Sequence, residues 1–200
     1  MCDLIIIGGG GHAKVISDIA KLNGYKVRGF LDDNCEIEEF LGYRRLGNVA
    51  DCVDFSDCCF VIAIGNSKIR REIAESYPNL NYITLIHPSA VIGSNVKIEK
   101  GTVVMPCAVI NTCAEIGEFC IVNTSAIVEH DCVIGKFTML APNCTVCGLT
   151  KIGRDCFIGA GSTIKNVLNI CDSVTVGLGA AVVKDITKPG TYIGVPAKKI

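Results

Sequence analysis

Residues 121–138 read IVNTSA IVEHDC VIGKFT and form three hexads of a run of sixteen that extends from Val91 to Ile186 without an insertion. Every hexad carries Ile, Val or Leu in its second place, and the sixth place is nearly always small. A period kept over so many units indicates a repeat architecture. One large and one small inward place per hexad fit a triangular prism whose faces are short strands. Three hexads make a coil of 18 residues, so we expect just over five coils and a height on the order of 25 Å.

The hexad register also predicts the role of several cysteines, of which the chain has 13. Four of them occupy the inward sixth place, where a cysteine behaves as a small hydrophobe. Their spacing of two hexads is unlike a metal-ligand spacing such as C-x2-C, so we expect packing and no metal. The four are Cys120, Cys132, Cys144 and Cys156. The cysteines of the first ninety residues have no assigned role, apart from Cys58-Cys59 as an apolar strand entry; they are Cys2, Cys35, Cys52, Cys58 and Cys59.

Composition narrows the class of protein. The chain has 200 residues, 50% of them hydrophobic, and a mean hydropathy of +0.44, which excludes a disordered chain. No apolar run approaches the ~20 residues of a membrane span, and the first residues lack the features of a signal peptide. We therefore expect a soluble cytoplasmic protein with reduced thiols and no membrane insertion. With 19 basic and 20 acidic residues, no charge pattern points to nucleic acid.

The first ninety residues follow a different pattern, in which short apolar runs alternate with helical spacing. A glycine turn separates the first run from the first helix, and an acidic pair ends the second run. Alternating strands and helices predict a small parallel sheet that binds ligands at the carboxyl ends of its strands. The expected strands are 4–7, 26–31 and 60–64, and the expected helices are 13–22 and 67–77. A proline-containing joint at 86–90 places the domain boundary between 1–88 and 89–200.

The glycine turn is a candidate nucleotide site. Gly8, Gly10 and Ala13 fit GxGxxA, and the pair Asp32-Asp33 follows about twenty residues later, where a carboxylate can hold a ribose hydroxyl. His12 stands at the start of the helix, where a side-chain donor and the helix N-terminus favour a phosphate. The competing interpretations are a tight turn without a ligand and an ordinary surface histidine.

His130 is the candidate for acid–base chemistry. It occupies the fourth place of its hexad, which points away from the interior, and Asp131 follows it directly. A histidine held by a carboxylate is a competent general base because the acid fixes the tautomer. The competing interpretation is an exposed histidine on a prism face. Cys132 is next in the chain, but its inward place argues against a nucleophile.

The whole chain resembles the PglD/NeuD branch of the hexapeptide-repeat acyltransferases. The resemblance rests on GGGGHA at 8–13, FLDD at 30–33, IAIGN at 62–66, LIHPSA at 85–90, NTSAIVEHDCVIG at 123–135 and GVPAKKI at 194–200. It implies an α/β Rossmann-like domain that binds a UDP-sugar, followed by a left-handed parallel β-helix with a C-terminal tail. It further implies transfer of acetyl from acetyl-CoA to the 4-amino group of a UDP-linked dideoxy-amino sugar in glycan biosynthesis, without a metal.

The resemblance also assigns residues. It implies His130 as general base with Asp131 in support; sugar-nucleotide contacts at Gly10, Gly11, His12, Asp32, Asp33, Gly65 and Asn123; and CoA contacts at Ala160 and Leu178. To this we add the Gly148 backbone N–H as the expected oxyanion donor. Met139 stands where family members often carry a second histidine. The family forms homotrimers, and we expect outward apolar residues to support association here, namely Phe119, Phe137 and Met139.

Three other functions compete with this interpretation. An O-acetyltransferase acting on sialic acid or another sugar hydroxyl would keep the same fold, although the glycine turn with its acidic pair favours a nucleotide-linked acceptor. A zinc lyase on a hexapeptide prism needs three histidine ligands, and this repeat contains only His130. A non-catalytic scaffold that binds a nucleotide sugar would have no use for the His130-Asp131 pair.

Overall fold

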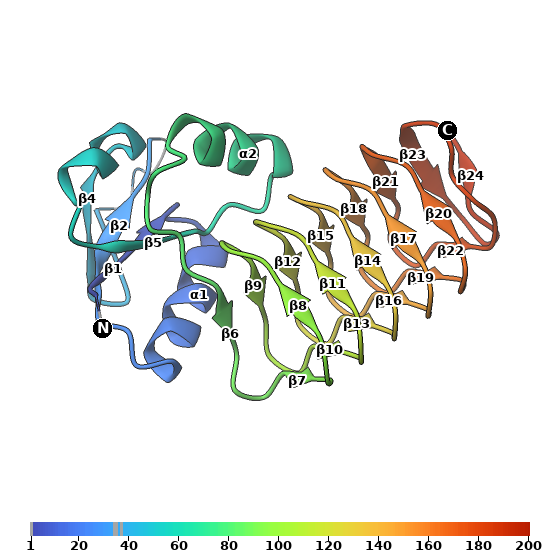
Figure 1. The fold of residues 1–200 in the computed structure, drawn as a ribbon. Helices are drawn as coiled ribbons and strands as arrows, with labels where there is room; N and C mark the ends of the chain where they lie inside the picture. The colour runs from blue at the N-terminus through green and yellow to red at the C-terminus, as the bar shows by residue number, and fades with distance from the viewer. Residues whose placement is uncertain (1, 34–35, 37) are drawn as a thin grey trace. The chain divides into compact units, whose positions relative to one another are not determined.

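The structure, a computed structural model, describes residues 2–33, 36 and 38–200. The chain divides into two compact units, residues 1–88 and residues 89–200 (Figure 1). The first unit is α/β, and the second is a parallel β-helix whose strands stack in successive coils. Both predicted architectures are confirmed. Within the described residues, no helix has the length and apolar character that a membrane span requires.

The first unit is built on a five-stranded sheet in the order β3-β4-β2-β1-β5. Strand β1 lies inside the sheet and pairs in parallel with β2 and β5. All four of its residues are buried, as its uninterrupted apolar sequence predicts. The strands are β1 (Leu4–Ile7), β2 (Val27–Leu31), β3 (Glu39–Phe40), β4 (Tyr43–Gly47) and β5 (Cys59–Ile62), and the helices are α1 (Gly11–Leu22), the 3-10 helix η1 (Val49–Asp54) and α2 (Ser67–Ser76). A short strand, β6 (Leu85–Ile86), ends the unit.

The expected three-strand core is correct, but the sheet continues beyond it. Strand β4 pairs in parallel with β2, and β3 folds back on β4 as an antiparallel partner. The segment YRRLG at Tyr43–Gly47 is polar, and its sequence therefore did not predict a strand. It becomes a strand because Phe30 and Leu31 of β2 offer it a free edge.

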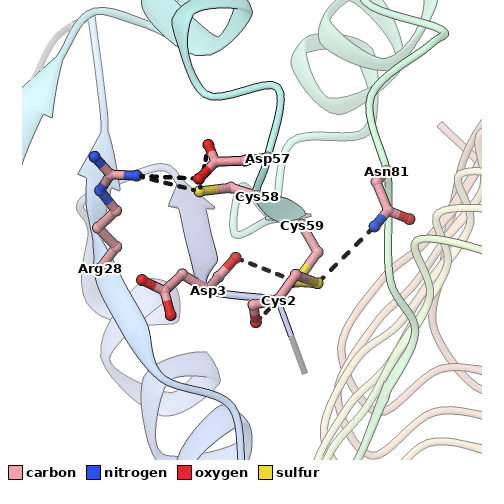
Figure 2. Close-up of a disulfide and its surroundings, with 7 residues drawn as sticks. All are labelled: Cys2, Asp3, Arg28, Asp57, Cys58, Cys59 and Asn81. Atoms are coloured by element: carbon pink, nitrogen blue, oxygen red, sulfur yellow. Dashed lines mark hydrogen bonds and ion pairs between the residues drawn. A yellow bond between two sulfur atoms is a disulfide. The ribbon is translucent and has the colours of Figure 1, made fainter.

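Two cysteines of the first unit form a disulfide, which corrects the expectation of reduced thiols throughout the chain. Cys2, just before β1, is bonded to Cys59, the first residue of β5 (Figure 2). The bond links two strands that are already neighbours, since Leu4 of β1 is the register partner of Cys59. Cys58 is buried, as a strand-entry residue should be, and its Sγ lies 3.6 Å from Arg28 Nη1. Cys35 lies outside the described residues.

The second unit has three parallel sheets of two-residue strands, with each strand paired to the one 18 residues later, as in Ile127↔Thr145. One face holds β7 (Val91–Ile92), β10 (Val109–Ile110), β13 (Ile127–Val128), β16 (Thr145–Val146), β19 (Thr163–Ile164) and β22 (Ala181–Val182). The second holds β8 (Lys97–Ile98), β11 (Glu115–Ile116), β14 (Val133–Ile134), β17 (Lys151–Ile152) and β20 (Asn169–Ile170). The third holds β9 (Val103–Val104), β12 (Ile121–Val122), β15 (Met139–Leu140), β18 (Phe157–Ile158), β21 (Val174–Val176), β23 (Gly190–Ile193) and the antiparallel β24 (Lys198–Lys199).

The corners of the prism lie at the fifth place of each hexad. From Asn95 to Gly179 every fifth place has a positive φ, between 55° and 71°. This left-handed conformation turns the chain through the corner, and Asn, Asp and Gly tolerate it best. Asp185 is the first fifth place outside this series. The chain leaves the coil there and continues into the β23–β24 hairpin.

Two of the outward apolar residues do not form the surface that we expected from the sequence. Phe119 and Phe137 are only 4% and 8% exposed. Their rings stack on each other with centroids 5.3 Å apart, and a Cβ at Gly101 would collide with Phe119. The fifth-place rings therefore pack along their own corner within one chain. They do not supply an association surface.

Candidate active site

The pair His130-Asp131 forms the corner that follows strand β13. His130 Nδ1 lies 2.8 Å from Asp131 Oδ2. The side chains are 57% and 49% exposed, so both point outward as the hexad register predicts. Asp131 has φ 57°, and its backbone N–H donates to Thr112 O of the preceding coil. The corner conformation thus holds the carboxylate beside one ring nitrogen and leaves the other, Nε2, for a reactant.

The backbone of Gly148 packs against the imidazole ring of His130. It occupies the same place one coil later, since β13 and β16 pair in register. A Cβ at Gly148 would lie 2.7 Å from His130 Nε2 and 2.8 Å from Cε1, which no real contact tolerates. The backbone N–H of Leu149 donates to His130 O, and Gly148 O accepts from Val167. Within the described residues the Gly148 N–H makes no backbone hydrogen bond.

The adjacent thiol is not a nucleophile. Cys132 is fully buried, and its Sγ lies 3.3 Å from Cys147 O inside the prism. Burial raises the pKa of the Cys132 thiol to about 11, so the reactive thiolate is scarce at neutral pH. The other sixth-place cysteines, Cys120, Cys144 and Cys156, are likewise buried. The prediction that these four residues serve packing is confirmed.

Three expected site residues lie on a different corner from His130. Asn123 follows β12, Ala160 follows β18 and Leu178 follows β21, all on the third face. Asn123 Oδ1 accepts from the Thr124 N–H, which holds its side chain at the corner. Leu178 is 76% exposed. One chain therefore does not bring Ala160 and Leu178 next to His130.

In the first unit, the glycine turn leaves open space at the carboxyl end of β1. Gly8 has φ 112°, and a Cβ there would lie 2.9 Å from Ala63 O. Gly10 is the N-cap of α1. A Cβ at Gly10 or Gly11 would meet nothing within 4 Å, which leaves room for a ligand at the helix N-terminus. Asp32 Oδ2 accepts the Gly9 N–H at 2.6 Å and so faces this turn.

The second member of the acidic pair has a structural partner. Asp33 Oδ1 accepts the Val49 N–H at 2.8 Å, at the start of η1. Arg45 of β4 donates two bonds, of 2.8 and 3.0 Å, to the backbone oxygen of Asp32. Sequence reasoning missed Arg45 because it did not predict β4.

A half-buried histidine at the start of α1 and a buried arginine of α2 belong to the glycine turn and to the segment after β5. His12 Nε2 is buried and has no hydrogen-bond partner among the residues that the structure describes. Burial, with a smaller contribution from the Arg70 charge, lowers the pKa of His12 to about 4. Arg70 is 1% exposed and donates to Ile64 O and Gly65 O, at 2.8 and 2.9 Å. The imidazole is thus neutral at pH 7 and has an unused ring nitrogen.

Arg70 was not predicted from the sequence, although a signal was present. It shares one face of α2 with Ile73 and Ala74, at spacings of three and four residues, and all three are buried. A cation at core spacing in a helix indicates a carbonyl or anionic partner. Asn66 caps the same helix by accepting from the Lys68 and Ile69 N–H groups. The IAIGN motif therefore ends in a rigid turn that positions Gly65.

Residues 3–77 match the PglD N-terminal domain family, and residues 131–166 match the bacterial transferase hexapeptide family of six repeats. The chain is similar to the acetyltransferase domain of PglB from Neisseria gonorrhoeae FA1090, with 32% identity, full coverage of both chains and a TM-score of 0.95; that domain is also known in complex with acetyl coenzyme A. A histidine-to-asparagine variant of perosamine N-acetyltransferase from Caulobacter crescentus, in complex with CoA and GDP-perosamine, is 30% identical over 99% of this chain and 96% of that one, with a TM-score of 0.93.

A curated relative matches over a shorter stretch. UDP-N-acetylbacillosamine N-acetyltransferase from Bacillus subtilis (strain 168) is 33% identical over 112 residues, which is 52% of each protein. The chain spans about half or less of the length of the curated relatives it matches. The full-length match to the PglB domain, together with the two family matches, covers both units. The chain therefore belongs to the family of hexapeptide-repeat sugar N-acetyltransferases with a PglD-type N-terminal domain.

Proposed function

We propose that the chain transfers acetyl from acetyl-CoA to the 4-amino group of a UDP-linked dideoxy-amino sugar. The observation that carries this proposal is the His130-Asp131 pair, with Nδ1 held at 2.8 Å by the carboxylate and Nε2 directed along the backbone of Gly148. That arrangement suits a general base acting on an amine. The relatives that act on UDP-N-acetylbacillosamine and on perosamine supply the substrate class.

The transfer is direct. The sugar nitrogen attacks the thioester carbonyl carbon while His130 Nε2 accepts the nitrogen's proton, and Asp131 stabilises the imidazolium that forms. The Gly148 N–H, which has no backbone partner among the described residues, donates to the oxygen of the tetrahedral intermediate. The carbon–sulfur bond then breaks, and CoA sulfur takes the proton from His130. No step uses Cys132.

The first unit binds the nucleotide part of the acceptor. The open Cα positions of Gly10 and Gly11 expose the N-terminus of α1 to a diphosphate. Asp32, oriented by the Gly9 N–H, accepts from a sugar or ribose hydroxyl. His12, at the second position of α1, adds a neutral imidazole at the same helix terminus. Gly65, whose backbone oxygen accepts from Arg70, lines the same edge of the sheet. Asp33 supports the site indirectly, because its carboxylate accepts the Val49 N–H.

Acetyl-CoA binds between copies of this chain in a homotrimer. Ala160 and Leu178 lie on a different corner from His130, so a groove that uses both corners needs a second prism. The 76% exposure of Leu178 is in line with a side chain that a partner covers. The family to which the chain belongs favours a cytoplasmic enzyme.

The experiment that tests the proposal measures release of CoA thiol from acetyl-CoA with four acceptors: a UDP-4-amino sugar, a GDP-4-amino sugar, a UDP-sugar without the amine, and free sialic acid. We expect release with the UDP-4-amino sugar, and a loss of about 10²–10⁴-fold in the His130→Ala variant. Calorimetry should show that this variant still binds UDP.

The acceptor that supports thiol release identifies the activity. Release only with the GDP-sugar would assign the chain to a different nucleotide, and release with sialic acid alone would make it an O-acetyltransferase. Full activity of His130→Ala would overturn the general-base assignment. No release with any acceptor, together with retained UDP binding, would favour a nucleotide-sugar-binding scaffold.

A further inference from the structure

A second carboxylate lies beside the reactive histidine, in addition to that of Asp131. Glu129 follows strand β13, directly precedes His130 and is half-buried. Its Oε2 accepts a hydrogen bond of 2.9 Å from Asn111 Nδ2. Asn111 holds the same place one coil earlier, because β10 and β13 pair in register. The carboxylate is therefore held by a neighbour that is itself part of the prism.

The carboxylate and the proton-accepting nitrogen are held by different coils. The bond to Asn111 draws the Glu129 side chain towards the coil before it. His130 Nε2 lies against Gly148, which belongs to the coil after it. The Glu129 N–H donates to Val146 O at 2.9 Å, so the backbone of this residue is fixed as well. If the thioester oxygen binds the Gly148 N–H, the side towards the earlier coil is left for the acceptor.

The other oxygen of the Glu129 carboxylate is open to a ligand. Oε1 has no hydrogen-bond partner among the residues that the structure describes, and it is not a buried atom. Glu129 also forms no ion pair with any of them. The next charged residue at the same place of the coils is Lys165, two coil steps or about 10 Å away. Glu129 thus offers a charged hydrogen-bond acceptor next to His130.

An amine and a hydroxyl differ in the number of hydrogens that they can give to such a site. A primary amine has two N–H bonds, so one proton can pass to His130 Nε2 while the other hydrogen donates to Glu129 Oε1. The nitrogen lone pair remains for the carbonyl carbon. A hydroxyl has one O–H, which His130 must take, and its lone pairs then face the carboxylate. The nitrogen also becomes positive as it attacks, which strengthens its bond to an anion.

We propose that Glu129 Oε1 accepts the second N–H of the acceptor's 4-amino group and thereby selects N-acetylation over O-acetylation. The inference rests on the proposed function, because it takes the amine to lose its proton to His130. Asn111 is a positioning residue, since it acts by holding Oε2. A fixed acceptor of this kind discriminates against a substrate that lacks the matching hydrogen.

The test compares the wild type and Glu129→Gln with a UDP-4-amino sugar and with the UDP-sugar that has a hydroxyl at the same carbon. Gln keeps the shape of Glu and can still accept from Asn111, but its amide nitrogen then replaces Oε1 and presents a donor. We expect kcat/KM for the amine to fall about tenfold or more. In calorimetry without acetyl-CoA, the preference for the amine over the hydroxyl sugar should shrink about tenfold too. The affinity for CoA and the melting temperature should stay unchanged.

Glu115→Gln is the matched control, because it makes the same substitution at an exposed glutamate on β11, on the second face. This variant should keep the wild-type preference for the amine. Asn111→Ala should lower the preference in the presence of Glu129 but should have no further effect in Glu129→Ala, because the two side chains act together.

An unchanged preference for the amine in Glu129→Gln would overturn the proposal. A loss of CoA affinity that parallels the loss of turnover would also overturn it, because the role of Glu129 would then be structural. Equal thiol release from the wild type and Glu129→Gln with the amine would keep the proposed function and remove Glu129 from it. If the wild type releases thiol with no acceptor, the proposed function fails, and the calorimetric comparison still decides whether Glu129 binds an amine.

Discussion

The imidazole of His130 lies directly against the backbone of Gly148, 18 residues later in the chain, so that a Cβ on Gly148 would stand 2.7 Å from Nε2. Neither neighbouring backbone segment can yield easily, because Leu149 N–H donates to His130 O across the same corner. A methyl group at this position must therefore displace the ring. The displaced ring no longer presents Nε2 to the amine.

The Gly148→Ala variant should consequently lose activity without unfolding. We expect turnover to fall by about 10- to 100-fold, because the general base is misplaced. The melting temperature should change little. Steady-state thiol release and thermal unfolding measure the two effects. Thr112→Ala, at the same place one coil earlier, is the control and should keep full turnover. Wild-type turnover in Gly148→Ala would show that the ring position is not critical.

Asp131 combines two properties that different substitutions separate. Its carboxylate holds His130 Nδ1, and its backbone has φ 57°. Asn adopts this conformation readily, whereas Ala is strained by roughly 1–2 kcal/mol. Asp131→Asn should therefore lower turnover about tenfold or more with little change in unfolding free energy, while Asp131→Ala should lower both.

Urea unfolding and thiol release on the two variants separate these effects. The Asn variant loses the acidic support of the imidazolium but keeps the shape of the corner. Equal turnover in Asp131→Asn and the wild type would remove Asp131 from the mechanism. Equal stability of the Ala and Asn variants would contradict the strain at this corner.

Most of the β-helix could be predicted because its period encodes the geometry directly. The second and sixth places point inward, so Ile134 and Cys132 are buried, and the fourth place points outward, so His130 is exposed. The register does not tell how a fifth-place side chain packs against its own column. Phe119 and Phe137 were for that reason expected on the surface, although they stack within the chain.

The first unit was less predictable because its contacts link segments with no common period. The sequence shows an acidic pair after β2, but not that Val49 takes the second carboxylate. That bond depends on the 3-10 helix η1 and on β4, which pairs at the sheet edge without an apolar pattern of its own. Arg70 beneath Gly65 is visible only once α2 is packed on the sheet.

His12 should make the stability of the chain depend on pH. Burial lowers its pKa from 6.5 to about 4 in the folded state, so the unfolded chain binds one more proton between these values. Stability is therefore complete above pH 6.5 and falls as the pH drops towards 4, by roughly 3 kcal/mol over that range. Urea unfolding at pH 7.5, 6 and 5 measures this slope.

His12→Gln provides the comparison for that slope, because it keeps a polar side chain without a titration in this range. The variant should lose less stability between pH 7.5 and 5 than the wild type does, while all carboxylate contributions stay the same. Parallel pH profiles for the two proteins would show that His12 is accessible to protons in the folded state.

The Cys2–Cys59 disulfide should contribute stability that reductant removes. The bond closes a loop with a sequence separation of 57, for which about 2–4 kcal/mol is expected. Dithiothreitol should lower the urea midpoint of the wild type but not of Cys2→Ala, since that variant has no bond to lose. Cys58→Ala is the matched control: it removes a buried thiol beside the bond, so it should lower stability yet keep the response to reductant. A wild-type midpoint that is indifferent to dithiothreitol, with both thiols alkylated in the absence of reductant, would contradict the bond.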